Sequence, residues 1–179
     1  MKEYWVEHGP VSSDLLQAEL LPQDTYAAAH SGLVICCHDV LIVQDGAYLL
    51  IRRKNHPAKD ILWPIGGRLL RGLSNEESLR RRVRRECQLE LSDLRYLGTA
   101  RTLFHTEPFG HGRGTDTLNL MYVAQGHGTL RLDDLHEAPT WLRPEELTQS
   151  FLMDLHPYVR DLLTLARGDL SGLPPHSVS

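Results

Sequence analysis

The sequence has few cysteines, few aromatic residues and no long hydrophobic run. Its cysteines, Cys36, Cys37 and Cys87, form no Cys-x-x-Cys pair, and their odd number argues against a disulfide framework. A reducing cytoplasm is therefore the expected compartment. No apolar run is long enough to span a membrane, and the opening residues, MKEYWVEHGP, lack the apolar core of a signal peptide.

The chain also lacks a surplus of positive charge. With 19 basic and 23 acidic residues, it has no general attraction for nucleic acid or for an anionic membrane, so we expect neither partner. A length of 179 residues with 41% hydrophobic content is that of one globular domain with a substantial core. We expect an N-terminal helical extension over residues 1–30, a main domain over residues 31–168 and a disordered tail over residues 169–179.

Turn residues and hydrophobic periodicity predict an α+β fold. Asp45-Gly46 is a typical hairpin turn between strands over residues 33–43 and 48–53. Ser74, with Glu77 three residues later, is typical of a helix start. The other expected elements are helices over residues 12–20, 23–30 and 152–167, strands over 94–105, 117–124 and 140–142, and a loop over 55–60. Strands on both sides of one central helix predict a mixed β-sheet flanked by helices, an α/β/α sandwich.

Residues 66–89, GGRLLRGLSNEESLRRRVRRECQL, carry the most specific pattern in the chain. This stretch resembles the Nudix box, G-x5-E-x7-R-E-U-x-E-E-x-G-U, in which U is a bulky aliphatic residue. The positions in register are Gly67, Arg81, Val83, Glu86 and Leu89. The positions that depart, where the pattern has Glu, Glu, Glu and Gly, are Leu73, Arg82, Arg85 and Gln88. Since one carboxylate of four remains, the resemblance predicts a Nudix domain over residues 31–168 with altered chemistry.

Further motifs over residues 23–144 resemble one branch of that family, the GDP-mannose mannosyl hydrolases, whose box also lacks its usual glutamates. The matching segments are Gln23–Ala27, Asp39 in HDVLIV, Arg52–Ala58, Gly66–Arg68, Gly114–Asp116, and Leu135-His136 followed by Trp141-Leu142 and Pro144. That branch releases GDP from the anomeric carbon of the sugar and leaves the diphosphate intact. The resemblance therefore implies a nucleotide-sugar as the substrate.

The resemblance also assigns roles to individual residues. Arg53 and Arg68 would stabilise the charge that develops on the departing diphosphate, because fixed positive donors are a major catalytic term. His136 would be the general base that activates water, a task suited to imidazole near neutral pH. Asp39 would contact the sugar.

A divalent metal and a homodimer are implied in the same way. Glu86 and the Gly66 carbonyl would hold Mg²⁺ or Mn²⁺, which prefer oxygen ligands. The family's third ligand, a glutamine, is Leu135 here, which should weaken metal binding. The family uses its N-terminal segment across a two-fold interface, and the corresponding segment here is around residues 23–33.

Simpler interpretations of these residues stay open. The arginines of the central helix are typical of a solvated helix end, and Glu86 could merely pair with Arg82 four positions earlier. His136 could be an ordinary loop histidine, whereas Asp39 in an apolar strand needs a partner. Another hypothesis is that Arg82 or Arg85 contacts the diphosphate directly in place of a metal ion.

Three functions follow from these patterns. The first is hydrolysis of a nucleotide-sugar to a nucleoside diphosphate and a free hexose. The alternative is a Nudix-fold protein that binds a nucleotide-sugar without turnover. The third, ordinary diphosphatase activity on a nucleoside diphosphate linked to another group, needs the missing glutamates.

Overall fold

The computed structural model describes residues 1–3 and 21–171, with the side chains of residues 169–171 excepted. The helix predicted over residues 12–20 and most of the predicted tail lie outside the described residues. Among the described residues, no helix is long and apolar enough to cross a bilayer. The elements are α1 Gln23–Gly32, β1 Ile35–Gln44, β2 Ala47–Arg53, β3 Leu62–Trp63, β4 Ile65–Arg68, α2 Asn75–Cys87, β5 Glu90–Phe104, β6 Thr115–His127, β7 His136–Leu142, the 3-10 helix η1 Pro144–Glu146, α3 Gln149–Asp154 and α4 Pro157–Ser171.

The strands form one mixed sheet in the order β3-β2-β1-β6-β5, with β4 added beside β1 and β7 beside β2. The β1–β6 pair is parallel, and the other pairs are antiparallel. Strand β1 changes partner along its length: its residues 42–44 pair with β2, and its residues 37–40 pair with β4. Strands β2 and β4 therefore part along the amino half of β1.

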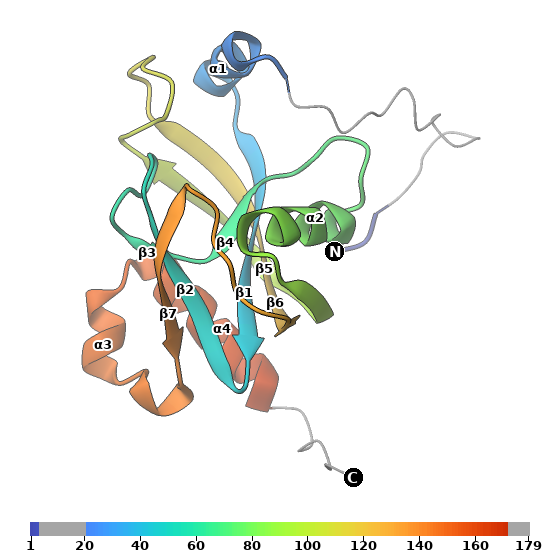
Figure 1. Cartoon of the computed structure of the whole chain (residues 1–179). Helices are drawn as coiled ribbons and strands as arrows, with labels where there is room; N and C mark the ends of the chain where they lie inside the picture. The colour runs from blue at the N-terminus through green and yellow to red at the C-terminus, as the bar shows by residue number, and fades with distance from the viewer. Residues whose placement is uncertain (4–20, 172–179) are drawn as a thin grey trace.

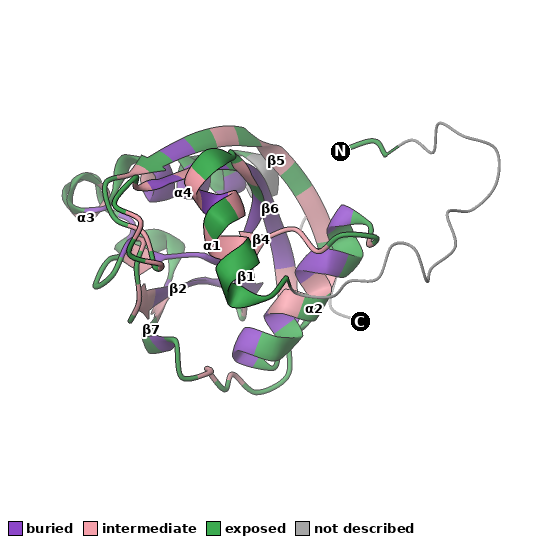
Figure 2. Cartoon of the chain, turned by 90° about the horizontal axis from the view of Figure 1, so that it is seen from above, coloured by how far each residue is buried: buried purple, intermediate pink, exposed green. Residues whose placement is uncertain are grey.

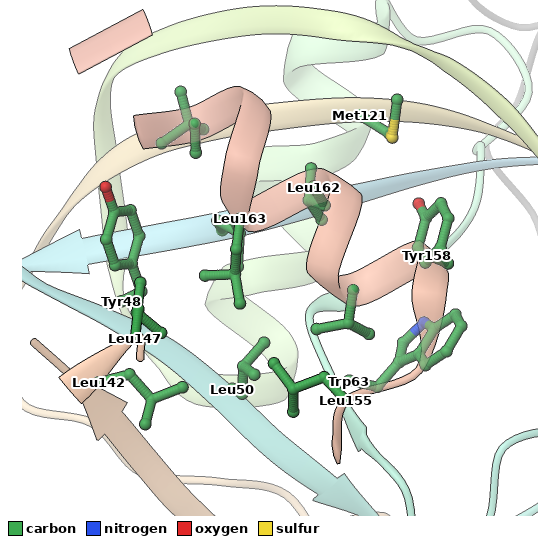
Figure 3. Close-up of a cluster of buried hydrophobic side chains, with 14 of the residues drawn as sticks. Tyr48, Leu50, Trp63, Met121, Leu142, Leu147, Leu155, Tyr158, Leu162 and Leu163 are labelled. Carbon is green, nitrogen blue, oxygen red and sulfur yellow. The ribbon is translucent and has the colours of Figure 1, made fainter. Parts of the chain in front are cut away.

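Side chains that alternate along β1 build a core on each face of the sheet. Leu41 and Val43 belong to the cluster that α4 covers, whereas Val40 and Ile42 belong to the cluster that α2 covers. Figure 1 shows α2 and α4 on opposite faces of the sheet, and Figure 3 shows the α4 side, where Leu162 packs toward the strands. The predicted α/β/α sandwich with a mixed sheet is confirmed.

Helix α2 begins where its capping sequence predicts. Ser74 accepts a hydrogen bond from the Glu77 backbone N–H at 3.2 Å, which satisfies one of the free donors of the first turn. Leu79 and Val83 are completely buried against the sheet, and Figure 2 shows buried and exposed residues interspersed around the helix. The amphipathic pattern thus fixes which face of α2 meets β1.

The closing helix predicted over residues 152–167 is wrong in one respect, because the structure has two helices, α3 and α4, in its place. Pro157 has no backbone N–H to continue a helix, and it suits the first turn of a new one. His156 caps that new helix, since its Nδ1 accepts a hydrogen bond from the Tyr158 N–H at 3.2 Å. The predicted strands were also too short: β5 begins at Glu90, β6 ends at His127 and β7 begins at His136.

Candidate active site

A pocket of about 250 Å³ opens where β2 and β4 part. All the residues to which the sequence assigns a functional role line it, namely Asp39, Arg53, Gly66, Arg68, Glu86 and His136. They come from β1, β2, β4, α2 and β7, so the fold brings together residues that are almost one hundred positions apart. The structure places these six residues around one pocket, and the role of each stays a prediction.

Positive charge dominates the pocket wall. Four arginines line the pocket, Arg53, Arg68, Arg82 and Arg85, against two carboxylates, Asp39 and Glu86. Burial lowers the pKa of the Arg53 guanidinium, which nearby carboxylates partly offset. Its Nε is buried without a hydrogen-bond partner. Because its cations outnumber its carboxylates, this wall is suited to a ligand that brings anionic oxygens.

Two glycines let the backbone of β4 pass close to its neighbours. A Cβ at Gly66 would collide with the Asp39 carboxylate and the His38 carbonyl. Gly67 has a φ of +147°, and a Cβ there would meet Arg82 Cζ at 3.0 Å. These positions therefore require glycine, and the guanidinium of Arg82 lies directly over the strand.

Glu86 is held by arginine. Arg82 Nη1 donates to its Oε1 at 2.6 Å, and Arg85 Nη2 lies 3.6 Å from the same oxygen. The pairing of Glu86 with Arg82, the simpler interpretation of this residue, is thus confirmed. The side chain of Glu86 is only 4% exposed, and its Oε2 is buried without a hydrogen-bond partner.

His136 is oriented by a residue that the sequence did not single out. Its Nδ1 lies 2.6 Å from Asp133 Oδ1, and because a carboxylate only accepts, Nδ1 carries the proton. In the neutral ring Nε2 is then an acceptor, and it lies 4.0 Å from Glu86 Oε2. His136 is also the register partner of Arg53 across β7 and β2. The sequence offered one signal for Asp133, which is that it precedes His136 by three positions. That spacing alone does not identify a pair, because the two side chains meet only through the turn of the backbone.

Asp39 has the partner that its burial requires. Tyr158 of α4 donates to Asp39 Oδ2 at 2.6 Å. Burial raises the pKa of Asp39 to about 6, although the Tyr158 hydrogen bond and the nearby Arg53 oppose that shift. This contact spans 119 positions of sequence, which is why no local pattern predicts it.

An aromatic group closes one end of the pocket. Tyr26 and His30 of α1 contact Phe109 of the β5–β6 loop with ring centroids 5.2 Å and 5.1 Å away. Arg68 Cζ lies 3.7 Å over the Tyr26 ring, a cation–π geometry. His30 Nδ1 lies 2.9 Å from His111 Nε2. The sequence did not predict this group, since its members are on two distant segments.

A buried polar patch forms another part of the wall. Thr102 and Thr117 share a hydrogen bond of 2.6 Å between their hydroxyl groups. Asn119 Nδ2 donates to both hydroxyls, at 2.9 and 3.1 Å. All three residues line the pocket, so one part of the wall is suited to hydroxyl or amide groups of a ligand.

Comparison with known proteins bears on the family. Residues 38–163 match the family model of the NUDIX domain, a span that covers α2 and the strands around it. The chain belongs to the Nudix family. No curated protein matches the chain.

Solved structures with the same fold are numerous. A MutT Nudix hydrolase from Burkholderia pseudomallei is 24% identical with a TM-score of 0.58, covering 74% of this chain and 98% of its own. The Nudix domain of Shewanella oneidensis NrtR, solved with ADP ribose, is 16% identical with a TM-score of 0.59, covering 84% and 99%. The ORF135 protein of E. coli is 26% identical with a TM-score of 0.56, covering 80% and 95%.

Nudix hydrolases generally use divalent metals such as Mg²⁺ or Mn²⁺. Among the described residues, no group of three or more His, Cys, Asp or Glu is arranged to hold a metal ion. Glu86 Oε1 already accepts from Arg82, which leaves Glu86 Oε2 and the Gly66 carbonyl for an ion that prefers an octahedral oxygen shell. Because two arginines contact the other oxygen of this carboxylate, the donor set suits a resident Mg²⁺ ion poorly, and ligation by Gly66 and Glu86 stays a prediction.

Proposed function

We propose that this chain hydrolyses a nucleotide-sugar of the GDP-mannose kind, releasing a nucleoside diphosphate and a free hexose. One observation carries the proposal: a histidine oriented by a carboxylate faces a pocket in which arginines outnumber carboxylates. His136 and Asp133 lie 2.6 Å apart, and four arginines share the wall. A base that activates water, beside cations for a phosphate leaving group, supports displacement at the sugar.

In the proposed reaction His136 Nε2 takes a proton from a water molecule. The water oxygen forms a bond with the anomeric carbon, and the bond from that carbon to the diphosphate oxygen breaks. The electron pair of that bond stays on the diphosphate, where Arg53 and Arg68 stabilise the negative charge. Holding water, sugar and cations in one pocket supplies the orientation that this step needs.

The sugar would lie against the buried end of the pocket. Tyr158 engages Asp39 through Oδ2 alone, and Asp39 lines the pocket, which supports the proposed contact with a sugar hydroxyl. The patch of Thr102, Thr117 and Asn119 offers further polar atoms. The Nudix domain of NrtR was solved with ADP ribose, a ligand in which a nucleotide is joined to a sugar through a diphosphate.

The test is a panel of nucleotide-sugars incubated in ¹⁸O-labelled water, with and without Mg²⁺ or Mn²⁺. We expect free hexose that carries ¹⁸O and an unlabelled nucleoside diphosphate. Release of nucleoside monophosphate would instead indicate cleavage inside the diphosphate, and it would overturn the proposal. The same panel identifies the base and the sugar, which no residue pattern specifies.

A second candidate is a protein that binds a nucleotide-sugar without turnover. The arginine contacts of Glu86, together with Leu135 where the resembling family has a metal ligand, favour it. Binding of a nucleotide-sugar by calorimetry, with no product after prolonged incubation, would support this candidate over the hydrolase.

A further inference from the structure

We propose that Arg82 and Arg85 take the place of the divalent cation, so that this chain binds a diphosphate group without metal. The inference rests on the proposed function in one respect, which is that the ligand is a nucleotide-sugar or its nucleoside diphosphate product. It adds a role for two arginines, at positions where the Nudix box has glutamate.

Arg82 is held in a single orientation by the backbone and by α2. Its Nη1 donates to Glu86 Oε1 at 2.6 Å, and its Nη2 donates to the Arg68 carbonyl at 3.1 Å. Gly67 leaves room for the guanidinium above β4, and the side chain is only 10% exposed. A cation fixed in this way loses little conformational entropy when a ligand binds.

The Nε atom of Arg82 is buried without a hydrogen-bond partner, as is Nε of Arg53. Both arginines line the same pocket. Guanidinium groups bind phosphate oxygens through several N–H donors in a planar fork. Both Nε atoms are closed to solvent, so a diphosphate would meet these two cations through the parts of their side chains that line the pocket.

Arg85 supplies the adjustable part of this arrangement. Its side chain is 57% exposed and contacts Glu86 Oε1 only at 3.6 Å, and it lines the pocket, so it can turn toward a bound phosphate. Arg84, the residue before it, instead donates to both oxygens of Glu90 at 2.7 Å and does not line the pocket. Arg84 is thus a matched control of equal charge on the same helix.

A divalent ion would enter this wall at a cost. It would compete with Arg82 for the carboxylate of Glu86, and it would lie beside a fixed positive charge. Like charges at such short range repel, and burial reduces solvent screening. A divalent ion and the guanidinium of Arg82 therefore exclude each other at the carboxylate of Glu86.

The first experiment is calorimetry with GDP and with inorganic pyrophosphate as probes, in buffer stripped of metal with a chelating resin. We expect the wild-type protein to bind GDP in this buffer. One charge-assisted hydrogen bond to the phosphates corresponds to ~10-fold or more in Kd. If the arginines already supply the positive charge, added Mg²⁺ should change the Kd by less, within ~3-fold. Arg85→Ala should weaken metal-free binding by at least ~10-fold, whereas Arg84→Ala should stay within ~2-fold.

Arg82 needs a variant that keeps the buried charge pair, since its removal would leave Glu86 with only the 3.6 Å contact to Arg85. Arg82→Lys keeps the positive charge but loses the planar fork and its bond to the Arg68 carbonyl, so we expect weaker metal-free binding of GDP by a protein that is still folded at the assay temperature, which circular dichroism checks. The double variant Arg82→Glu with Arg85→Glu restores two of the three missing carboxylates of the box, with Leu73 unchanged. We expect it to bind Mn²⁺, measured by the relaxation of water protons, and to bind GDP only when metal is present.

The outcomes separate this inference from the proposed function. GDP binding that appears only with Mg²⁺ in the wild-type protein would overturn the inference, and the hydrolase proposal would stand. Metal-free binding lost in Arg85→Ala, but without hydrolysis of any nucleotide-sugar, would support the inference and overturn the hydrolase.

Discussion

At the scale of single residues, His38 and Asp39 show how a strand directs neighbouring side chains to opposite layers. His38 Nε2 lies 2.8 Å from Ser78 Oγ on the α2 side, and Asp39 accepts from Tyr158 on the α4 side. Burial lowers the pKa of His38 to about 4 and raises the pKa of Asp39 to about 6. Both shifts favour the neutral form of the side chain. As pH rises through these ranges, His38 therefore increases the free energy of unfolding and Asp39 decreases it.

The variant Asp39→Asn should separate these effects. Between pH 3.8, the ordinary pKa of the carboxyl, and about 6, the folded state binds more protons than the unfolded state at this residue. The free energy of unfolding contributed by Asp39 therefore falls as pH rises through this window. Since Asn cannot ionise, we expect the variant to gain stability relative to wild type from pH 4 to pH 7, on the order of 1–3 kcal/mol. Urea unfolding at both pH values measures this difference, and an equal difference at both would contradict the assignment.

The variant His136→Ala tests the proposed base. We expect turnover to fall by at least ~10²-fold with nearly unchanged nucleotide affinity, because general bases contribute ~10² to 10⁴. His127→Ala is the control, since that side chain contacts Ser92 and does not line the pocket. Steady-state rates and calorimetry distinguish the two effects. If His136→Ala kept near-normal turnover, the nearby carboxylates Asp134 and Glu137 would be tested next.

At the scale of elements, α2 supports both the core and the site. One face buries Leu79 and Val83 against the sheet, and the same helix presents Arg82 and Glu86 to the pocket. Ser78 links this helix to its surroundings, because its Oγ accepts from the Leu70 N–H at 2.9 Å and contacts His38 at 2.8 Å. The position of the charged residues therefore depends on how α2 is attached to β1.

Loss of that link should cost more than loss of the helix cap. Ser78→Ala leaves a completely buried histidine without its hydroxyl partner, and we expect the free energy of unfolding to fall by about 1–3 kcal/mol. Ser74→Ala removes an exposed capping bond and should cost about 1 kcal/mol. Urea unfolding of both variants measures the difference. A cost for Ser78→Ala no larger than that of the cap would show that α2 is held by apolar packing alone.

At the scale of the whole molecule, the sheet leaves apolar side chains uncovered near α1. Leu33 and Leu103 are 63% and 73% exposed. Leu118 is also exposed, and it pairs in register with Cys36 of β1. Leu103 and Leu118 lie on neighbouring strands, β5 and β6, two register positions apart, and exposed apolar side chains on one surface are typical of an interface. Leu33 directly follows α1, in the segment that corresponds to the one the resembling family uses across its two-fold interface.

We expect a homodimer through this surface. Light scattering at micromolar concentration should return twice the monomer mass, because closed two-fold pairs are the commonest assemblies. Leu103→Glu combined with Leu118→Glu should shift the protein to a monomer, since charge on an apolar interface is costly. Met153→Glu, at a 65% exposed position of α3, is the control and should leave the mass unchanged. A monomer mass for the wild-type protein would remove the prediction.

Much of the architecture follows from local sequence. The Asp45-Gly46 turn, the Ser74 cap and the box residues in register predict β1, β2 and α2, because turn chemistry, capping and periodicity act over a few residues. The break between α3 and α4 was missed, although Pro157 marks it, since the apolar pattern of residues 152–167 continues across it. The same local logic predicts the pairing of Arg82 with Glu86, because helical spacing sets that contact.

The sequence by itself determined the Nudix family of this chain and the residue types of its pocket. Only the tertiary structure decided which partners these residues have: Tyr158 for Asp39, Asp133 for His136 and the aromatic group of α1 beside Arg68. Tyr158 and the aromatic group come from segments far along the chain, and Asp133 meets His136 through a loop turn. The contacts therefore depend on chain geometry and on the strand register, which no local propensity encodes.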